Sequence, residues 1–363
     1  MDKHRKLNDF MNKWQDLPEQ RSEQWFADRM FSVGASVMGV LSLCKDYYGN
    51  IVSANKYQSI RHLIREKCGL EPITDYTALN WGCIMEPVCT AFTSRVFECK
   101  IHEMGAIPNV ECALQRCSPD GVGVIEKMGN KIASFEFKCP IGRMPNGEVP
   151  IYYRAQVMAC LCAVEPSDIG IFVDIAIRNC SVDDWKYDNN RYNESCFEYT
   201  FPNGNKKKPS RFKKDDIEAL IVGLIYDETK DSKKGEDFGG KVSPIDYGSC
   251  SGDVFKELMD DCARKKTKRC EFSEIFMRGV DDPKIELPDG VIGFIPLKIM
   301  LAKIVPIEKK CGFVSNYVPL ITTIINIVRD VVDLPIEERG QKIDELIDER
   351  NIIALQRDIP LLE

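Results

Sequence analysis

Two carboxylates and a lysine are spaced so that a hairpin could bring them together. Residues 131–139 are rich in strand-forming side chains and alternate in polarity, which predicts a strand at 132–138. Successive strand side chains point to opposite faces, so Glu136 and Lys138 should share one face while Phe137 points the other way. If the strand before the Pro-Asp-Gly turn that contains Asp120 pairs with this strand, Asp120 meets Glu136 at one end of a hairpin. Oxygen ligands of this kind suit Mg²⁺ or Mn²⁺.

Three short motifs follow one another in order around this strand. They are Ser118-Pro119-Asp120-Gly121, Glu136-Phe137-Lys138-Cys139-Pro140 and Tyr153-Arg154-Ala155-Gln156-Val157. An aspartate followed by Glu-x-Lys on the next strand resembles the PD-(D/E)xK nuclease core. The longer ordered set resembles the YqaJ-type viral recombinases, which are the phage lambda type of alkaline exonuclease. The bare Glu-x-Lys is a weak signal, whereas the ordered set is strong and covers roughly residues 18–178.

The resemblance implies a metal site with two ions. Asp120 and Glu136 would ligate a divalent ion together with the backbone carbonyl of Phe137, and Asp120 would share a second ion. Two ions about 3.5–4 Å apart can steady both the attacking and the leaving oxygen. Glu86 matches an acid that the family aims at the second metal or its water. From the residues alone, Glu86 lies in the first turn of a helix that opens at Trp81, where the helix dipole favours acidic residues.

Two further polar residues have roles that the resemblance implies. Lys138 would orient or help deprotonate the attacking water and stabilise negative charge on the phosphate. Gln156 matches a family glutamine near the metal-bound phosphate or water. The alternative for Glu136 and Lys138 is a surface ion pair worth well under about 1 kcal/mol. That alternative explains neither the Asp120 turn nor a lone glutamine in a mostly apolar helix at 152–164.

Two other stretches are candidates for contact with DNA. Gly34 breaks an amphipathic helix, and Ser36, near the start of the next one, would on its own be read as a cap. A helix start with a hydroxyl and a nearby arginine is also an anion site. In the resembled family the Arg and Ser of R-x₆-S hold the terminal 5′-phosphate, and Arg29 and Ser36 have that spacing. Arg143 lies in a loop at 140–150 that is either a DNA-guiding arm or a plain connector.

The composition is that of an ordinary globular protein, with 363 residues, 44% hydrophobic and 29% charged. No apolar run is long enough to span a bilayer, and the charged N-terminus is not a secretory signal. We therefore expect an intracellular protein of the host cytoplasm or nucleus, with no membrane association. The net charge of −7 does not indicate nucleic-acid binding. Nucleic-acid binding is still compatible with this net charge if positive charges are clustered and an acidic metal site contributes negative charge. The 16 cysteines without a C-x-x-C pair favour reduced core residues over disulfides or zinc ligands.

These patterns and the resemblance predict an α/β fold. Its centre is a PD-(D/E)xK core like that of restriction endonucleases, in which helices flank a mixed central sheet. We place the nuclease core at residues 1–200, because the resemblance fades after residue 200. Residues 201–363 would form a C-terminal extension of unknown role that could pack on this core.

The resemblance implies a divalent-metal-dependent 5′→3′ exonuclease that acts on double-stranded DNA ends in viral recombination, repair or replication. The source would be a large DNA virus or a phage. One alternative is a PD-(D/E)xK endonuclease or a DNA/RNA nuclease, and another is a non-catalytic DNA-binding protein. The complete set of Glu86, Asp120, Glu136, Lys138 and Gln156 argues against a decayed site. The resemblance also implies a ring of three chains and a strand-annealing partner protein.

Overall fold

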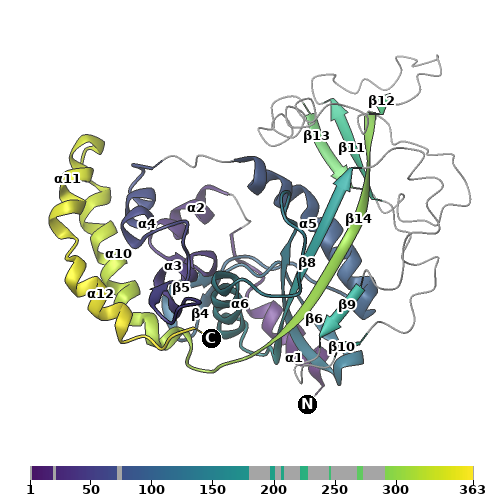
Figure 1. Ribbon diagram of the computed structural model, residues 1–363, viewed down its shortest axis with the longest axis horizontal. Coiled ribbons are helices and arrows are strands. Elements are labelled where there is room, and N and C mark those ends of the chain that lie inside the picture. Colours follow the sequence, from purple (N-terminus) through teal and green to yellow (C-terminus); the bar gives the residue numbers. More distant parts are fainter. Residues whose placement is uncertain are drawn as a thin grey trace, which may run out of the picture.

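A long mixed sheet runs through the centre of the molecule (Figure 1). The computed structural model describes residues 2–18, 22–71, 76–179 and 291–362, and the short strands between residues 197 and 272. The path of the sheet is β10-β9-β14-β8-β7-β6. Its main strands are β6 (Gly121–Ile125), β7 (Lys131–Lys138), β8 (Ile169–Asn179) and β14 (Val291–Glu308). The shorter ones are β9 (Phe197–Thr200), β10 (Lys206–Lys207), β11 (Ile221–Asp227), β12 (Ile245–Asp246) and β13 (Lys268–Phe272).

The predicted strand at 132–138 is confirmed as β7, and its neighbours make the sheet mixed. β6 and β7 form an antiparallel hairpin that turns through Gly129 and Asn130, whose φ angles are 79° and 56°. β7 then runs parallel to β8, because α6 (Ile151–Ala163) carries the chain back across the sheet. β14 pairs antiparallel with β8 on its other side. The expected α/β class, with a mixed sheet flanked by helices, is thus confirmed.

The strand before the Pro-Asp-Gly turn does not pair with β7. It is β5 (Cys112–Cys117), which lies in a separate sheet between β1 (Val33–Gly34) and β4 (Ile107–Asn109). The partner of β7 is β6, the strand that follows Asp120. The expectation named the wrong strand, because the sequence has strand-forming residues on both sides of the turn.

Helices cover the sheet on both faces. Phe135, Phe137 and Val173 point to one face and pack in one cluster with buried residues of α5 (Tyr76–Phe97). Phe172 points to the other face and packs with buried residues of α6. The expected helix start at Trp81 is wrong, because α5 already begins at Tyr76. Glu86 consequently lies in the helix interior and not in its first turn.

The C-terminal helices form a layer beside α6 and the N-terminal segments (Figure 1). They are α10 (Val318–Val332), α11 (Ile336–Leu346) and α12 (Glu349–Arg357). α10 buries one apolar stripe against the same cluster as α4 (Ile60–Lys67) and α6. The Tyr317 hydroxyl lies 2.7 Å from the Ser42 hydroxyl, next to α3 (Met38–Leu41). The division of the chain at residue 200 stays a prediction.

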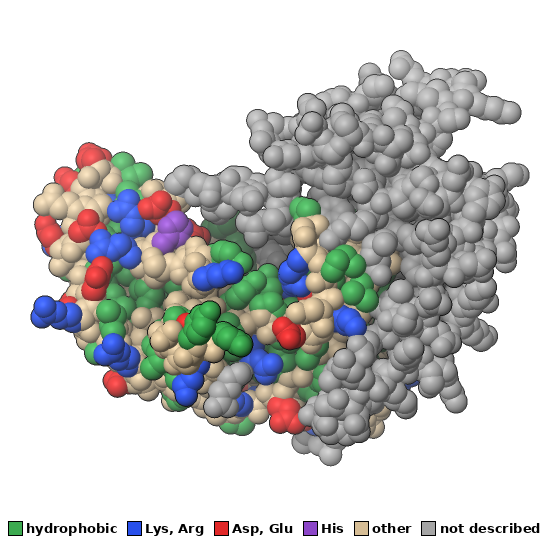
Figure 2. Space-filling model, viewed as in Figure 1, with side chains coloured by type: hydrophobic (Ala, Val, Ile, Leu, Met, Phe, Trp, Pro, Cys, Tyr) green, Lys and Arg blue, Asp and Glu red, His purple; other side chains and the backbone are tan. Residues whose placement is uncertain are grey.

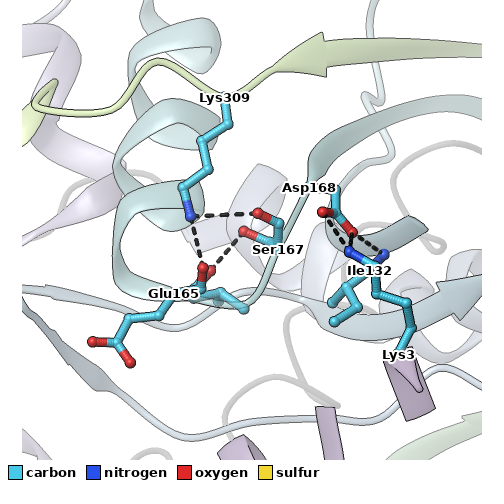
Figure 3. Close-up of polar contacts among 7 residues, drawn as sticks. Lys3, Ile132, Glu165, Ser167, Asp168 and Lys309 are labelled. Carbon is cyan, nitrogen blue, oxygen red and sulfur yellow. Dashed lines mark hydrogen bonds and ion pairs between the residues drawn. The ribbon is translucent and has the colours of Figure 1, made fainter. Parts of the chain in front are cut away.

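A group of polar contacts ties four segments together at the start of the sheet (Figure 3). Lys3 of α1 (Lys3–Lys13) donates to both carboxylate oxygens of Asp168 at 2.7 and 2.8 Å, and the Ile132 amide donates to Asp168 at 2.8 Å. Lys309, which follows β14, donates to the Glu165 carbonyl at 2.9 Å. These bonds fix the starts of β7 and β8 against the end of β14.

Cys117 and Cys160 form a disulfide, contrary to the expectation of reduced core cysteines. Their Cα atoms are 5.3 Å apart, which lies within the normal range for such a bond. The bond joins the end of β5 to the last turn of α6. Sequence spacing gave no sign of it, because 43 positions separate the two cysteines. No helix in the described part of the chain is long and apolar enough to cross a membrane.

The close packing of α3 on α6 predicts that a larger residue at Gly39 destabilises the protein. A Cβ added at Gly39 would stand 2.6 Å from Tyr152 Cβ and 2.9 Å from Tyr152 Cα. The backbone would have to move, so Gly39→Ala should lower the free energy of unfolding by about 1–3 kcal/mol. Urea denaturation followed by circular dichroism measures this. Gly142→Ala is the matched control, because a Cβ at Gly142 meets nothing within 4 Å. Equal stability of the two variants would contradict the packing.

Candidate metal and phosphate site

The carboxylate of Glu136 is the most deeply buried charged group of the predicted site. Glu136 lies near the end of β7, and only 2% of its surface is exposed. Its Oε1 accepts hydrogen bonds from Lys138 Nζ and, at 2.6 Å, from Gln156 Nε2. Its Oε2 has no hydrogen-bond partner among the described residues. One oxygen is therefore held by the protein, and the other is buried with unused capacity.

Asp120 lies beside Glu136, because it precedes β6 and Gly121 pairs with Phe135. Its Oδ2 accepts a hydrogen bond of 2.5 Å from the Phe137 amide, which fixes the carboxylate against β7. The Phe137 side chain points into the cluster on the opposite face, as expected from strand alternation. A metal role for the Phe137 carbonyl stays a prediction.

Burial raises the pKa of both carboxylates. Burial raises the pKa of Glu136, and Asp120 adds to this, so that it reaches about 8. Burial also raises the pKa of Asp120, although Lys138 and the Phe137 amide oppose it. Burial alone would lower the pKa of Lys138, but the charges of Glu136 and Asp120 raise it above its ordinary value. Glu86 acts on Glu136 in the same direction as Asp120, so α5 brings its acid to this site.

The donor set fits a divalent cation. Asp120 and Glu136 offer carboxylate oxygens, one of them buried without a partner, and a cation would offset their repulsion. Mg²⁺ keeps several waters and needs few protein ligands. Within the described residues, no group of three or more His, Cys, Asp and Glu side chains is already arranged as a metal site.

Arg29 and Ser36 meet at Gly34. Ser36 Oγ and Arg29 Nη2 lie 3.6 and 3.9 Å from the position that a Cβ on Gly34 would take. The expectation that Ser36 caps a helix is wrong, because Gly34 is the cap residue of a short 3₁₀ turn (Ala35–Val37) and no side chain caps that turn or α3. The exposed hydroxyl of Ser36 instead lies beside an arginine.

Lys67, from the last turn of α4, adds a second positive charge at this point. Its Nζ donates to the carbonyls of Arg29 at 2.8 Å and Ser32 at 2.6 Å. Burial lowers the pKa of Lys67 to about 8, and the positive charge of Arg29 contributes. The basic pattern of residues 61–67 marks Lys67 as polar, but only the fold shows that it lies at Arg29.

The Arg29 cluster and the carboxylates are connected through β5. Gly34 pairs with Arg116 of β5, and Arg116 Nη1 lies 2.8 Å from Asp28 Oδ2 of α2 (Glu23–Met30). Four residues after Arg116 the chain reaches Asp120. The positions of both groups are thus coupled through a single strand.

Arg143 does not point freely out of its loop. Its Nη1 lies 2.5 Å from Asp174 Oδ2 of β8, next to Lys138 in the sheet register. Asp174 is a lone aspartate in an apolar run, and the sequence alone does not show which residue it contacts. Tyr153 was quoted only as part of a motif, yet Lys138 Nζ lies 4.9 Å from its ring centroid, which favours the charged lysine.

Surface charge is mixed on the described face. Figure 2 shows Lys and Arg side chains interspersed with Asp and Glu side chains, and not gathered into one basic face. This face has no large basic patch among its described residues. Positive charge gathers in small groups such as Arg29 with Lys67.

Comparisons with known proteins agree with the motif order. Residues 24–164 match the model of the YqaJ-like viral recombinase domain. Two African swine fever virus proteins, from the Vero-adapted Badajoz strain and a Malawi tick isolate, are each 21% identical over 87% of this chain and 87% of their own length. An alkaline exonuclease from Laribacter hongkongensis is 22% identical with a TM-score of 0.33, covering 43% of this chain and 74% of its own. The structure of the same enzyme in complex with dAMP is 22% identical with a TM-score of 0.32, and the match covers 42% of this chain and 73% of that one.

The motifs quoted from the sequence, from Arg29 to Gln156, fall within the matched segment. Over residues 24–164 this chain is therefore similar to the YqaJ-like viral recombinase domain.

Proposed function

We propose that this protein is a divalent-metal-dependent 5′→3′ exonuclease that acts on double-stranded DNA ends in viral DNA recombination, repair or replication. The observation that supports this best is Glu136. It is buried, Lys138 and Gln156 hold one of its oxygens, the other has no partner in the described chain, and Asp120 lies beside it. A purely structural ion pair has no need of an orphaned buried oxygen, which costs about 1–3 kcal/mol.

In this proposal Asp120, Glu136 and the Phe137 carbonyl hold Mg²⁺ or Mn²⁺, and Glu86 approaches a second ion directly or through water. The bound ions would polarise the phosphoryl oxygen and lower the pKa of an attacking water. Lys138 stays protonated beside the two carboxylates and stabilises negative charge on the phosphate. Gln156 fixes the Glu136 carboxylate and would donate its other amide hydrogen to a phosphate oxygen or a water.

Selection of a 5′ end would depend on Arg29, Ser36 and Lys67. Two positive charges and a hydroxyl at one point form a donor set for a terminal phosphate dianion. A phosphate there would also offset the mutual repulsion of Arg29 and Lys67. Polarity follows, because only a strand that begins with a 5′-phosphate would be seated. Assembly as a ring of three chains, a strand-annealing partner, and the cytoplasm or nucleus of the host remain predictions.

Digestion of an asymmetric duplex tests the proposal. A linear duplex with a 5′-phosphate on one end and a 5′-hydroxyl on the other should lose the phosphorylated strand first in Mg²⁺ or Mn²⁺, and neither strand in EDTA. Glu136→Ala should lower the rate at least about 10²–10³-fold, because it removes a metal ligand. Denaturing gels of strands labelled at either end measure this.

Two other results would point elsewhere. Cutting of closed circles would support the endonuclease alternative, and cutting of RNA would widen the substrate class. Metal-independent DNA binding without any cutting in Mg²⁺ or Mn²⁺ would refute the nuclease and leave a DNA-binding protein. Lys342→Ala is a control for charge removal, because Lys342 pairs with Glu345 on the distant α11.

The lowered pKa of Lys67 predicts a pH dependence of end binding. A bound phosphate favours the charged amine, so affinity for a 5′-phosphorylated end should fall as pH rises through about 8. Lys67→Arg keeps its charge and should remove this fall, whereas Lys67→Ala should bind weakly at every pH. Fluorescence anisotropy in EDTA, with a 5′-hydroxyl duplex as the matched probe, measures it. Identical pH profiles for the two probes would contradict a role of Lys67 at the end phosphate.

A further inference from the structure

A row of three charged residues crosses the sheet next to Glu136. The register pairs Lys138 of β7 with Asp174 of β8, and Asp174 with Lys303 of β14. Residues that are directly paired in neighbouring strands point to the same face of a sheet. Lys138 and Glu136 share a face, so Asp174 and Lys303 belong to that face too. The third member of the row comes from the C-terminal third of the chain.

Asp174 is buried too deeply to be an ordinary surface acid. Only 2% of it is exposed, and its Oδ1 has no hydrogen-bond partner among the described residues. A buried carboxylate is costly unless cations surround it. Its Oδ2 accepts from Arg143 Nη1 at 2.5 Å, with Lys138 and Lys303 on either side in the register. Asp174, in the middle of β8, therefore has positive side chains around it beside the end of β7.

The loop at 140–150 contacts the same row of charged residues. It carries Arg143, and a Cβ on Gly147 would stand 3.8 Å from Lys303 Cδ. Arg143 is 37% exposed, although its partner is buried, so it lies at the boundary between the sheet and solvent. A guanidinium has five N–H donors and can serve a carboxylate and a phosphate at the same time.

The distance across the row sets which phosphate this group could meet. Neighbouring strands are about 4.8 Å apart, so the backbones at Lys138 and Lys303 are separated by about 10 Å. That separation is too large for both residues to serve one phosphate equally, so Lys303 would contact a different phosphate from the one that Lys138 contacts. Arg143 and Lys303 would thus lie beside the phosphate that Lys138 contacts in the proposed reaction.

We propose that Arg143 and Lys303 form a second phosphate-binding subsite on this face, with Asp174 as the positioning residue of Arg143. The subsite would hold the phosphodiester next to the one that is cut. The inference rests on the proposed nuclease function and extends it, since it makes β14, outside the matched recombinase segment, part of the DNA-binding surface.

Binding of the full-length protein to a 5′-phosphorylated duplex in EDTA, over a range of salt concentrations, tests the subsite. Each lost phosphate contact reduces the slope of log K against log salt by about one. Lys303→Ala and Arg143→Ala should each show this reduction, and the melting temperature of each variant shows whether it is folded. Lys342→Ala should leave the slope unchanged.

Asp174→Asn separates positioning from folding. The asparagine has the same size but cannot hold Arg143 by charge, so the variant should bind DNA as Arg143→Ala does. The double variant should be no weaker than Arg143→Ala alone, whereas two independent effects would add and would refute the coupling. In cleavage assays Lys303→Ala should raise KM several-fold and leave kcat within about twofold.

Failure of the subsite and failure of the nuclease have different signatures. An active enzyme whose Lys303→Ala variant keeps the full salt slope and KM would overturn the subsite alone. A wild-type protein that never cuts DNA, but whose Lys303→Ala and Arg143→Ala variants lose slope, would overturn the nuclease and retain the phosphate contacts.

Discussion

The site depends on one buried carboxylate. Glu136 loses its hydration at the end of β7, and two donors on different elements compensate by bonding the same oxygen. Lys138 comes from the same strand, two positions on, while Gln156 comes from α6 on the face of the sheet. Moving α6 by an ångström would therefore leave a charge without compensation in a poorly hydrated place. The compensation of this buried charge therefore depends on the packing of α6.

The surrounding elements are arranged to hold α6 where Glu136 needs it. The Cys117–Cys160 disulfide ties the helix to β5, the strand that leads to Asp120. On another side, Gly39 lets α3 approach Tyr152 more closely than a side chain would allow. The C-terminal helices then pack on the same apolar cluster. Residues far apart in sequence thus fix one helix from three directions.

Local structure could be predicted from the sequence, whereas contacts between distant residues could not. Alternation was enough to predict β7 and to put Glu136 and Lys138 on one face, because a strand's faces depend only on neighbouring residues. The choice between β5 and β6 as its partner was not predictable, since both flank the Asp120 turn with strand-forming residues. Ser36 failed as a cap, because the turn at Gly34 shifts the helix start. The neighbours Asp174 and Lys303 lie more than a hundred residues apart, so spacing gave no sign of them.

The position of β14 has a consequence for the order in which the chain can fold. β8 leaves the ribosome long before its partner, because residues 180–290 separate Asn179 from Val291. At about 5–20 residues per second this delay is on the order of ten seconds. During that time one edge of an apolar strand offers unpaired backbone groups to any other strand. Until β14 is made, this edge is a place where another strand could pair. A fragment that ends at residue 164, with the matched segment, would lack β8 altogether.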